Sequence, residues 1–178
     1  GVTATDGSKS TLTAQTIVIN TGSINEKPSF EVSSNLAFDS TGILNLKTLP
    51  KHLAVVGGGY IGLEFASMFA EFGSKVTIVA RSGVLKNEDD DVRESVKTLL
   101  QTQGIEILEG CEVKNLKDST LNFTQNSEAK SLDADAFLLA TGRVAATAEL
   151  NLSAAGVQTD AKGNVSVNEF LQTAQPHI

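Results

Sequence analysis

Three glycines that follow a short apolar run have the spacing of a phosphate-binding turn. Gly57, Gly59 and Gly62 form the pattern GxGxxG between the apolar run 53–56 and the stretch 60–72, where apolar residues recur at helical spacing. The first glycine of such a turn permits a tight bend, the second lets a pyrophosphate approach the backbone, and the third lets the helix pack closely on the strand. GxGxxG alone is a weak signal, and a glycine-rich turn without a ligand is the alternative. Strand, turn and helix in this order are nevertheless the context that the motif requires.

The pattern therefore predicts a dinucleotide site at the start of the helix. Amides without an acceptor and the helix dipole both favour an anion there. The candidate residues of this turn are Gly57, Gly58, Gly59, Tyr60, Ile61 and Gly62.

The end of the next strand indicates which dinucleotide is favoured. An NAD site usually has an Asp or Glu there, which binds the ribose 2′-hydroxyl. This chain has Ala80, followed by Arg81 and Ser82, with Lys86 a few residues further on. Because Arg and Ser can donate hydrogen bonds to a 2′-phosphate, the pattern favours NADP(H) over NAD(H). The alternative is that Arg81 and Lys86 are solvated loop charges and that the site does not distinguish the two.

Extended and helical patterns alternate between residues 51 and 143. They predict an α/β fold with a Rossmann-like parallel sheet built from βαβ units. Strands are expected at 53–56, 75–80, 105–108 and 136–140, with helices at 60–72 and from the run Asp89-Asp90-Asp91 to Gly104. Three short stretches, 111–116, 119–124 and 129–132, predict an antiparallel β-meander.

The flanking segments carry weaker signals. Residues 12–20 are rich in β-branched residues and predict a strand. Residues 24–50 are rich in Ser, Asn and Pro, which predicts a connector with one helical turn near 43–46. After residue 143, only the turn 160–164 and the strand-like segment 165–167 stand out.

Composition and charge exclude several classes of protein. The chain has 178 residues, 40% of them apolar and 20% charged, which is typical of a globular domain rather than a disordered chain or a membrane span. The net charge of −7 has the wrong sign for nucleic-acid binding. One cysteine cannot form an internal disulfide, and residues 1–15 lack a secretory pattern, so a cytoplasmic location is expected.

Other reactive residue types do not form a site in the sequence. His52 and His177 stand at expected loop or linker positions, so neither is predicted to be a buried base. Cys111 is most simply a small, partly buried residue of the meander. The run Asp89-Asp90-Asp91 is explained by helix capping, and no metal site is predicted.

Several motifs together resemble the FAD-dependent pyridine nucleotide-disulfide oxidoreductases. They are LAVVGGGYIGLEFA at 53–66, ATGR at 140–143 and TAQPHI at 173–178, so that the resemblance covers nearly the whole chain. FDSTG at 38–42 and EFASMF at 64–69 are most similar to the branch that contains mercuric reductases and hypothiocyanous acid reductases. Val79-Ala80-Arg81 is similar to the NADPH-using mercuric reductases.

The resemblance implies that this chain is the nicotinamide-nucleotide-binding part of a larger flavoenzyme. Residues 51–143 would be the NAD(P)-binding domain, 24–50 a connector, and 1–23 and 144–178 segments of a truncated FAD domain. The parent would pass hydride from NAD(P)H to FAD and on to a redox cysteine pair, and would be a homodimer. Since the first GxGxxG and the CxxxxC of such enzymes are absent here, the chain alone is expected to bind no FAD and to be inactive.

The resemblance also assigns roles to residues of the NAD(P) domain. Glu64 would pair with a flavin-domain lysine, and Tyr60 would shield the flavin until nicotinamide enters, although no catalytic residue lies in this chain itself. Thr141, Gly142 and Arg143 join the cofactor-binding candidates.

Two other interpretations stay open. The chain could be a free-standing dinucleotide-binding or redox-sensing protein without catalysis. A complete small dehydrogenase is disfavoured, because no His, Lys or Tyr is placed as a proton donor.

Overall fold

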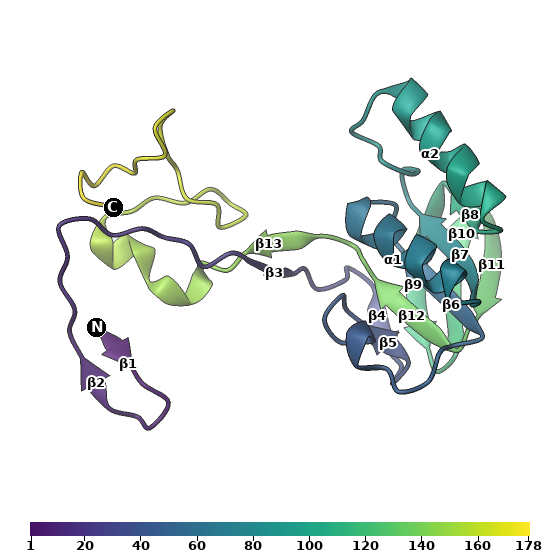
Figure 1. Cartoon of the computed structure of the whole chain (residues 1–178), viewed down its shortest axis with the longest axis horizontal. Coiled ribbons are helices and arrows are strands. Elements are labelled where there is room, and N and C mark those ends of the chain that lie inside the picture. Colours follow the sequence, from purple (N-terminus) through teal and green to yellow (C-terminus); the bar gives the residue numbers. More distant parts are fainter. The chain divides into compact units, whose positions relative to one another are not determined.

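Five parallel strands form the largest sheet of the structure, a computed structural model that describes residues 1–178 (Figure 1). Their order is β5-β12-β6-β7-β8, and every neighbouring pair in this sheet is parallel. This confirms the predicted Rossmann-like α/β fold. The strands span Ala37–Phe38 (β5), Ala136–Leu139 (β12), His52–Val56 (β6), Lys75–Ala80 (β7) and Glu106–Glu109 (β8).

Two helices connect the strands as the sequence predicts. Helix α1, Tyr60–Glu71, links β6 to β7, and helix α2, Asp90–Thr102, links β7 to β8. Each helix is followed by a glycine with positive φ, Gly73 at 98° and Gly104 at 79°, which lets the chain turn into the next strand. The acidic first turn of α2 suits the helix dipole, but the side chain of its N-cap residue, Asp89, makes no capping hydrogen bond.

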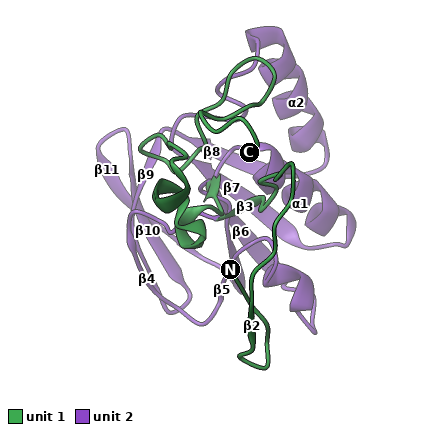
Figure 2. Ribbon diagram, turned by 90° about the vertical axis from the view of Figure 1, so that its left-hand side faces the viewer, with its two compact units in different colours: residues 1–24, 143–178 green, residues 25–142 purple.

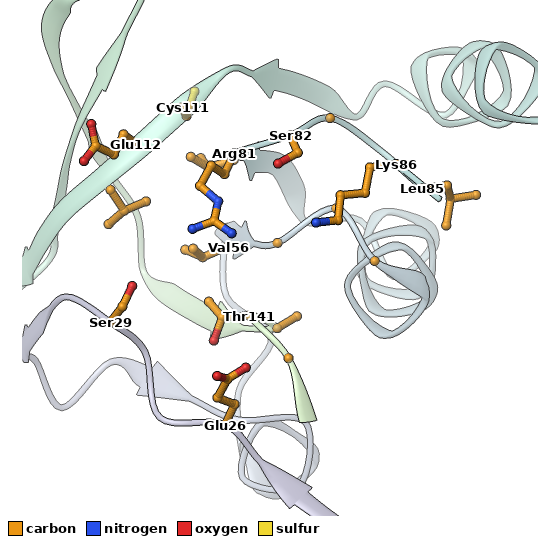
Figure 3. Close-up of a pocket in the computed structure, with 18 of the residues that line it drawn as sticks. Glu26, Ser29, Val56, Arg81, Ser82, Leu85, Lys86, Cys111, Glu112 and Thr141 are labelled. Atoms are coloured by element: carbon orange, nitrogen blue, oxygen red, sulfur yellow. The ribbon is translucent and has the colours of Figure 1, made fainter. Parts of the chain in front are cut away.

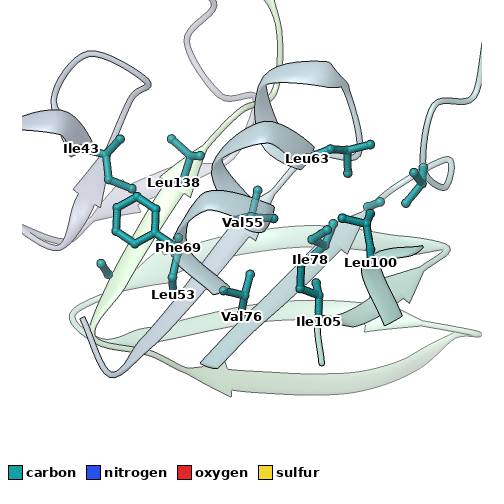
Figure 4. Packing of buried hydrophobic residues seen from close by; sticks show 14 of the residues in the cluster. Ile43, Leu53, Val55, Leu63, Phe69, Val76, Ile78, Leu100, Ile105 and Leu138 are labelled. Carbon is teal, nitrogen blue, oxygen red and sulfur yellow. The ribbon is translucent and has the colours of Figure 1, made fainter. Parts of the chain in front are cut away.

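Both faces of the parallel sheet are buried. Residues Leu53 and Val55 of β6 point to the face covered by α1 and α2, where Leu63, Phe69 and Leu100 pack (Figure 4). The alternate residues Ala54 and Val56 point to the opposite face, against the meander. The continuous apolar runs of β6 and β12 follow from this two-sided burial.

The second face is covered by the predicted meander and one additional strand. Strands β9 (Cys111–Lys117), β10 (Thr120–Gln125) and β11 (Glu128–Asp133) are antiparallel, and β4 (Glu31–Ser33) adds to β9 in parallel. The connector thus differs from its expected character, because β4 and β5 extend the two sheets. Its helical turn is a 3-10 helix at Ile43–Asn45.

The chain divides into two compact units (Figure 2). The sheet unit is Asn25–Gly142, which contains everything described so far, and the terminal unit is Gly1–Ile24 with Arg143–Ile178. The terminal unit holds the short pair β1–β2, strand β13 and two 3-10 helices. Strand β3, which pairs with β13, ends at Asn25, the first residue of the sheet unit. The bounds of these elements are Val2–Thr3 (β1), Lys9–Ser10 (β2), Ser23–Asn25 (β3), Arg143–Ala145 (β13), Ala148–Leu150 (η2) and Leu152–Ala155 (η3).

Two predicted strands of the terminal unit are wrong. Residues 12–20 have no regular structure, because no strand pairs with them and β-branched composition alone cannot supply a ladder partner. Residues 165–167 form only a single bridge, from Val165 to Thr159. In neither unit is any helix long and apolar enough to cross a membrane.

Candidate functional site

A cavity of about 630 Å³ lies at the carboxyl ends of β12, β6 and β7 (Figure 3). Helix α1 carries the chain from β6 toward β7, while β12 lies on the other side of β6. The loops after these strands therefore diverge and leave a crevice, which is where open α/β sheets bind ligands. Most of the predicted site residues line it: Gly57, Gly58, Gly59, Tyr60, Arg81, Ser82, Lys86, Thr141 and Gly142.

Close packing explains most of the glycines in the turn. A Cβ on Gly57, whose φ is +125°, would lie 2.2 Å from the carbonyl oxygen of Ala140. On Gly58 it would lie 2.5 Å from the Gly83 oxygen, and on Gly62 it would lie 2.5 Å from the Gly57 oxygen. These three glycines are required by the fold itself.

Gly59 is different. It has φ −87°, and a Cβ built on it would meet no atom within 4 Å. The fold would therefore tolerate a side chain here, which would take up space that a bound group could occupy. An open glycine at this position fits a pyrophosphate that must approach the backbone.

Gly59 is also the N-cap of α1. It provides no capping side chain, and there is no acidic residue in the first turn. The Leu63 amide donates to the Gly59 carbonyl oxygen at 3.1 Å, whereas the first amides of a helix have no acceptor within it. This helix end can receive an anion.

The loop after β7 carries the residues that were predicted to donate hydrogen bonds to a 2′-phosphate. Arg81, Ser82 and Lys86 are exposed and line the cavity (Figure 3). The loop is joined to the glycine turn by the Leu85 amide, which donates to the Gly58 carbonyl oxygen at 2.8 Å.

Several predicted residues do not line the cavity. Ala80 is 1% exposed and packs toward Gly58, Gly62 is buried behind the turn, and Ile61 and Glu64 lie further along α1. Arg143 belongs to the terminal unit, where its Nε donates to Ser23 Oγ at 2.8 Å.

The cavity also has walls that the sequence did not indicate. Glu26, Ser29 and Phe30 contribute from the segment before β4, and Cys111, Glu112 and Val113 from the start of β9. The β9 residues could have been found, since they closely follow the end of a parallel strand. The others depend on the pairing of β4 with β9, which has no local sequence signal.

Charges of both signs surround the cavity. The hydrogen bond and charge of Lys114, with a smaller contribution from Arg81, lower the pKa of Glu112. The Tyr60 hydroxyl donates a hydrogen bond to Glu88, which raises the pKa of Tyr60. Burial raises the pKa of the Cys111 thiol, so the thiolate is disfavoured. Cys111 was predicted to be partly buried, and with 1% exposure it is buried more completely than that.

The two histidines lie outside this cavity. His52 is not in a linker but begins β6, and its Nε2 lies 2.9 Å from Thr77 Oγ1. His177 is exposed. In residues 1–178, no cluster of three or more His, Cys, Asp or Glu side chains could hold a metal ion.

The parallel sheet, covered on both faces and with a glycine turn beside the cavity, defines a Rossmann-like α/β protein. Comparison with known families makes this more specific. The chain belongs to the pyridine nucleotide-disulphide oxidoreductase family, whose pattern it matches over residues 2–178.

Curated relatives of the chain are oxidoreductases. It is 42% identical over 165 residues to the probable pyridine nucleotide-disulfide oxidoreductase RclA of Escherichia coli, covering 91% of this chain and 37% of RclA. It is 36% identical over 177 residues to dihydrolipoyl dehydrogenase of Geobacillus stearothermophilus, covering 96% of this chain and 37% of that enzyme. A mercuric reductase of Lysinibacillus sphaericus is 36% identical over 173 residues, with 94% of this chain and 32% of that enzyme covered.

A solved structure supports the same relationship. The HOCl-induced flavoprotein disulfide reductase RclA from Escherichia coli superposes with a TM-score of 0.79 at 39% identity, covering 89% of this chain and 37% of that one. The chain thus spans little more than a third of the length of these relatives.

Proposed function

We propose that the sheet unit binds NAD(P)H in the cavity at the carboxyl ends of β12, β6 and β7. The observation that carries this proposal is Gly59, the one glycine of the turn for which the fold itself gives no reason. It stands at the N-terminus of α1 and lines the cavity, as a pyrophosphate site requires. NAD(P)H supplies a hydride, while the residues of this chain bind and orient it.

We propose further that the chain is part of a flavoprotein that transfers this hydride to FAD and then to a cysteine pair. The family match and the 37% coverage of RclA support this. Residues 1–23 and 144–178 would then belong to a flavin domain, residues 24–50 to the connector and residues 51–143 to the NAD(P) domain. Glu64 and Tyr60 would lie near the flavin and the nicotinamide, and the parent enzyme would be a homodimer. On its own, the chain would bind the dinucleotide without turning it over.

Substitution of Gly59 tests the binding site. Gly59→Val places a branched side chain where the pyrophosphate would approach, and we expect calorimetry to show that NADPH binding falls by roughly 100-fold or more. Since a Cβ at this position meets nothing within 4 Å, circular dichroism and the Tm should change little. Gly59→Ala is the graded control and should have a smaller effect. A Gly59→Val chain that binds like the parent would show that the phosphate site lies elsewhere.

We also propose that the site prefers NADP(H) to NAD(H). The donors Arg81, Ser82 and Lys86 lie together on one wall, and no acidic residue ends β7. Glu112 stands near Arg81 and opposes this preference, so we expect a moderate ratio of the two dissociation constants. Because Ala80 is buried against Gly58, replacing it with Glu would disturb the turn, and Arg81 is the better residue to change.

The contribution of Arg81 to the preference for NADP(H) is tested with Arg81→Ala and with a matched control on another wall of the cavity. We expect Arg81→Ala to weaken NADPH binding by about tenfold and NADH binding much less, since an exposed charged hydrogen bond is worth about 1–2 kcal/mol. Lys27→Ala removes the same charge from the same cavity and should affect both dinucleotides equally. The difference should shrink as salt is raised. Equal losses from Arg81→Ala would show that this loop does not recognise the phosphate.

A further inference from the structure

The backbone of the loop after β7 is held at one residue, which lies between the side chains proposed to donate hydrogen bonds to the 2′-phosphate. Val84 is fully buried and lies between Ser82 and Lys86. Its amide donates to Glu109 Oε1 at 3.0 Å, and its carbonyl oxygen accepts from Arg93 Nε at 3.1 Å. Two charged side chains, one from β8 and one from α2, therefore hold the backbone N–H and the backbone C=O of a single loop residue.

Glu109 is itself held in place. Its Oε2 lies 3.0 Å from Lys97 Nζ. Burial alone would raise the pKa of the Glu109 carboxyl, but the Val84 amide, Lys97 and Arg93 outweigh it, and the pKa lies below its ordinary range. The group that accepts from Val84 is thus a carboxylate at neutral pH, and hydrogen bonds to charged acceptors are the stronger ones.

The carboxylate of Glu109 faces the loop backbone and is not part of the cavity wall. Glu109 pairs with Ala80 in the β7–β8 register, one strand away from the position where an NAD site has its acid. Glu109 does not line the cavity. A Cβ on Gly83 would lie 2.7 Å from Glu109 Oε1, which shows how closely the loop packs on this side chain.

We propose that Glu109 is a positioning residue for 2′-phosphate recognition, because its carboxylate fixes the Val84 amide and thereby the directions of Arg81, Ser82 and Lys86. This inference rests on the proposed function and names a determinant of its specificity. The pyrophosphate turn contacts this loop through the Leu85 amide and the Gly58 carbonyl oxygen. It should nevertheless depend less on Glu109, since Gly57 is also held by its own amide, which donates to the Val79 carbonyl oxygen at 2.9 Å.

A positioning role and a purely electrostatic role of Glu109 predict opposite changes in NADPH affinity when its carboxylate is removed. Removing a negative charge near an anion site should tighten NADPH binding if charge alone matters. If Glu109 positions the loop, Glu109→Ala should instead weaken NADPH binding by about tenfold and NADH binding by less than about threefold. Glu112→Ala is the matched control, because Glu112 lines the cavity and its carboxylate pairs with Lys114 at 2.7 Å rather than with the loop backbone. It should tighten NADPH binding a few-fold.

Two conservative variants separate the hydrogen bond from the charge. Glu109→Gln keeps an oxygen acceptor for the Val84 amide and should restore most of the NADPH affinity. Glu109→Asp keeps the charge but is too short to reach this amide, so it should weaken NADPH binding several-fold and speed hydrogen exchange at Val84. Glu109→Asp therefore tests the positioning role of Glu109 even if Glu109→Ala does not fold.

Dissociation constants for NADPH and NADH, measured on the 178-residue chain and these variants, give clear outcomes. Tighter NADPH binding by Glu109→Ala, equal losses for both dinucleotides, or unchanged affinity in Glu109→Asp would each overturn the positioning role and leave the proposed function intact. If the parent chain bound neither dinucleotide, both the function and the positioning role would be refuted.

Discussion

The two units of this chain differ most in what they bury. Every buried hydrophobic side chain except Val157 belongs to the sheet unit, Asn25–Gly142. The terminal unit is about half as long and exposes Val18, Phe170 and Leu171 by 74–79%. Since apolar burial is the main favourable contribution to folding, the sheet unit holds most of the stability of the chain. It also contains the whole cavity, so the site depends on the unit that has the core.

Truncating one phenylalanine in each unit tests this difference, and we expect it to give the largest effect on stability. Phe137 is fully buried in β12, and Phe137→Ala should lower the free energy of unfolding by about 3–5 kcal/mol. Phe170 is 74% exposed in the terminal unit, and Phe170→Ala should change it by less than about 0.5 kcal/mol. Urea unfolding followed by circular dichroism measures both. A loss from Phe170→Ala comparable to that from Phe137→Ala would mean that the terminal unit contributes to the core.

The same contrast explains which parts of the fold could be predicted from the sequence. In the sheet unit, apolar residues repeat with the period of the element that buries them, as in 53–56 and 60–72, so strand and helix were both predicted correctly. In the terminal unit, residues 12–20 have strand-like composition but no partner strand. Composition specifies a preference, whereas a strand also needs a neighbour that supplies hydrogen bonds.

The residues of the candidate site likewise fall into those that a local sequence pattern predicts and those that only strand pairing places. The glycine turn and the end of β7 are local signals, and the structure brings Gly59 and Arg81 to one cavity. Glu26 and Ser29 reach the cavity only through the pairing of β4 with β9, and Glu109 reaches the loop only through the register of β7 with β8. These placements depend on contacts between residues far apart in the sequence, and no local pattern within a single sequence encodes such contacts.

The chain's two histidines, one in each unit, allow a comparison in which we expect the smallest effect. His52 begins β6 in the sheet unit, and His177 is exposed in the terminal unit. Burial lowers the pKa of His52, and the charge of Lys75 lowers it further, while the Asp133 carbonyl oxygen and the charges of Asp135 and Glu106 act in the opposite direction. The net shift is downward, so the folded sheet unit favours the neutral imidazole.

The sign of the resulting pH dependence follows from this shift. Because the folded-state pKa of His52 lies below the ordinary value of about 6.5, the unfolded chain binds the proton first as the pH falls. The free energy of unfolding should therefore be constant above this value, decrease as the pH falls through it, and level off below the folded-state pKa. We expect this decrease to be much smaller than the effect of Phe137→Ala. His52→Gln should remove it, and the control His177→Gln should retain it, in urea unfolding measured between about pH 8 and pH 5.5, above the range where most carboxylates titrate. If His52→Gln kept the full decrease, a group other than His52 would be responsible for this pH dependence.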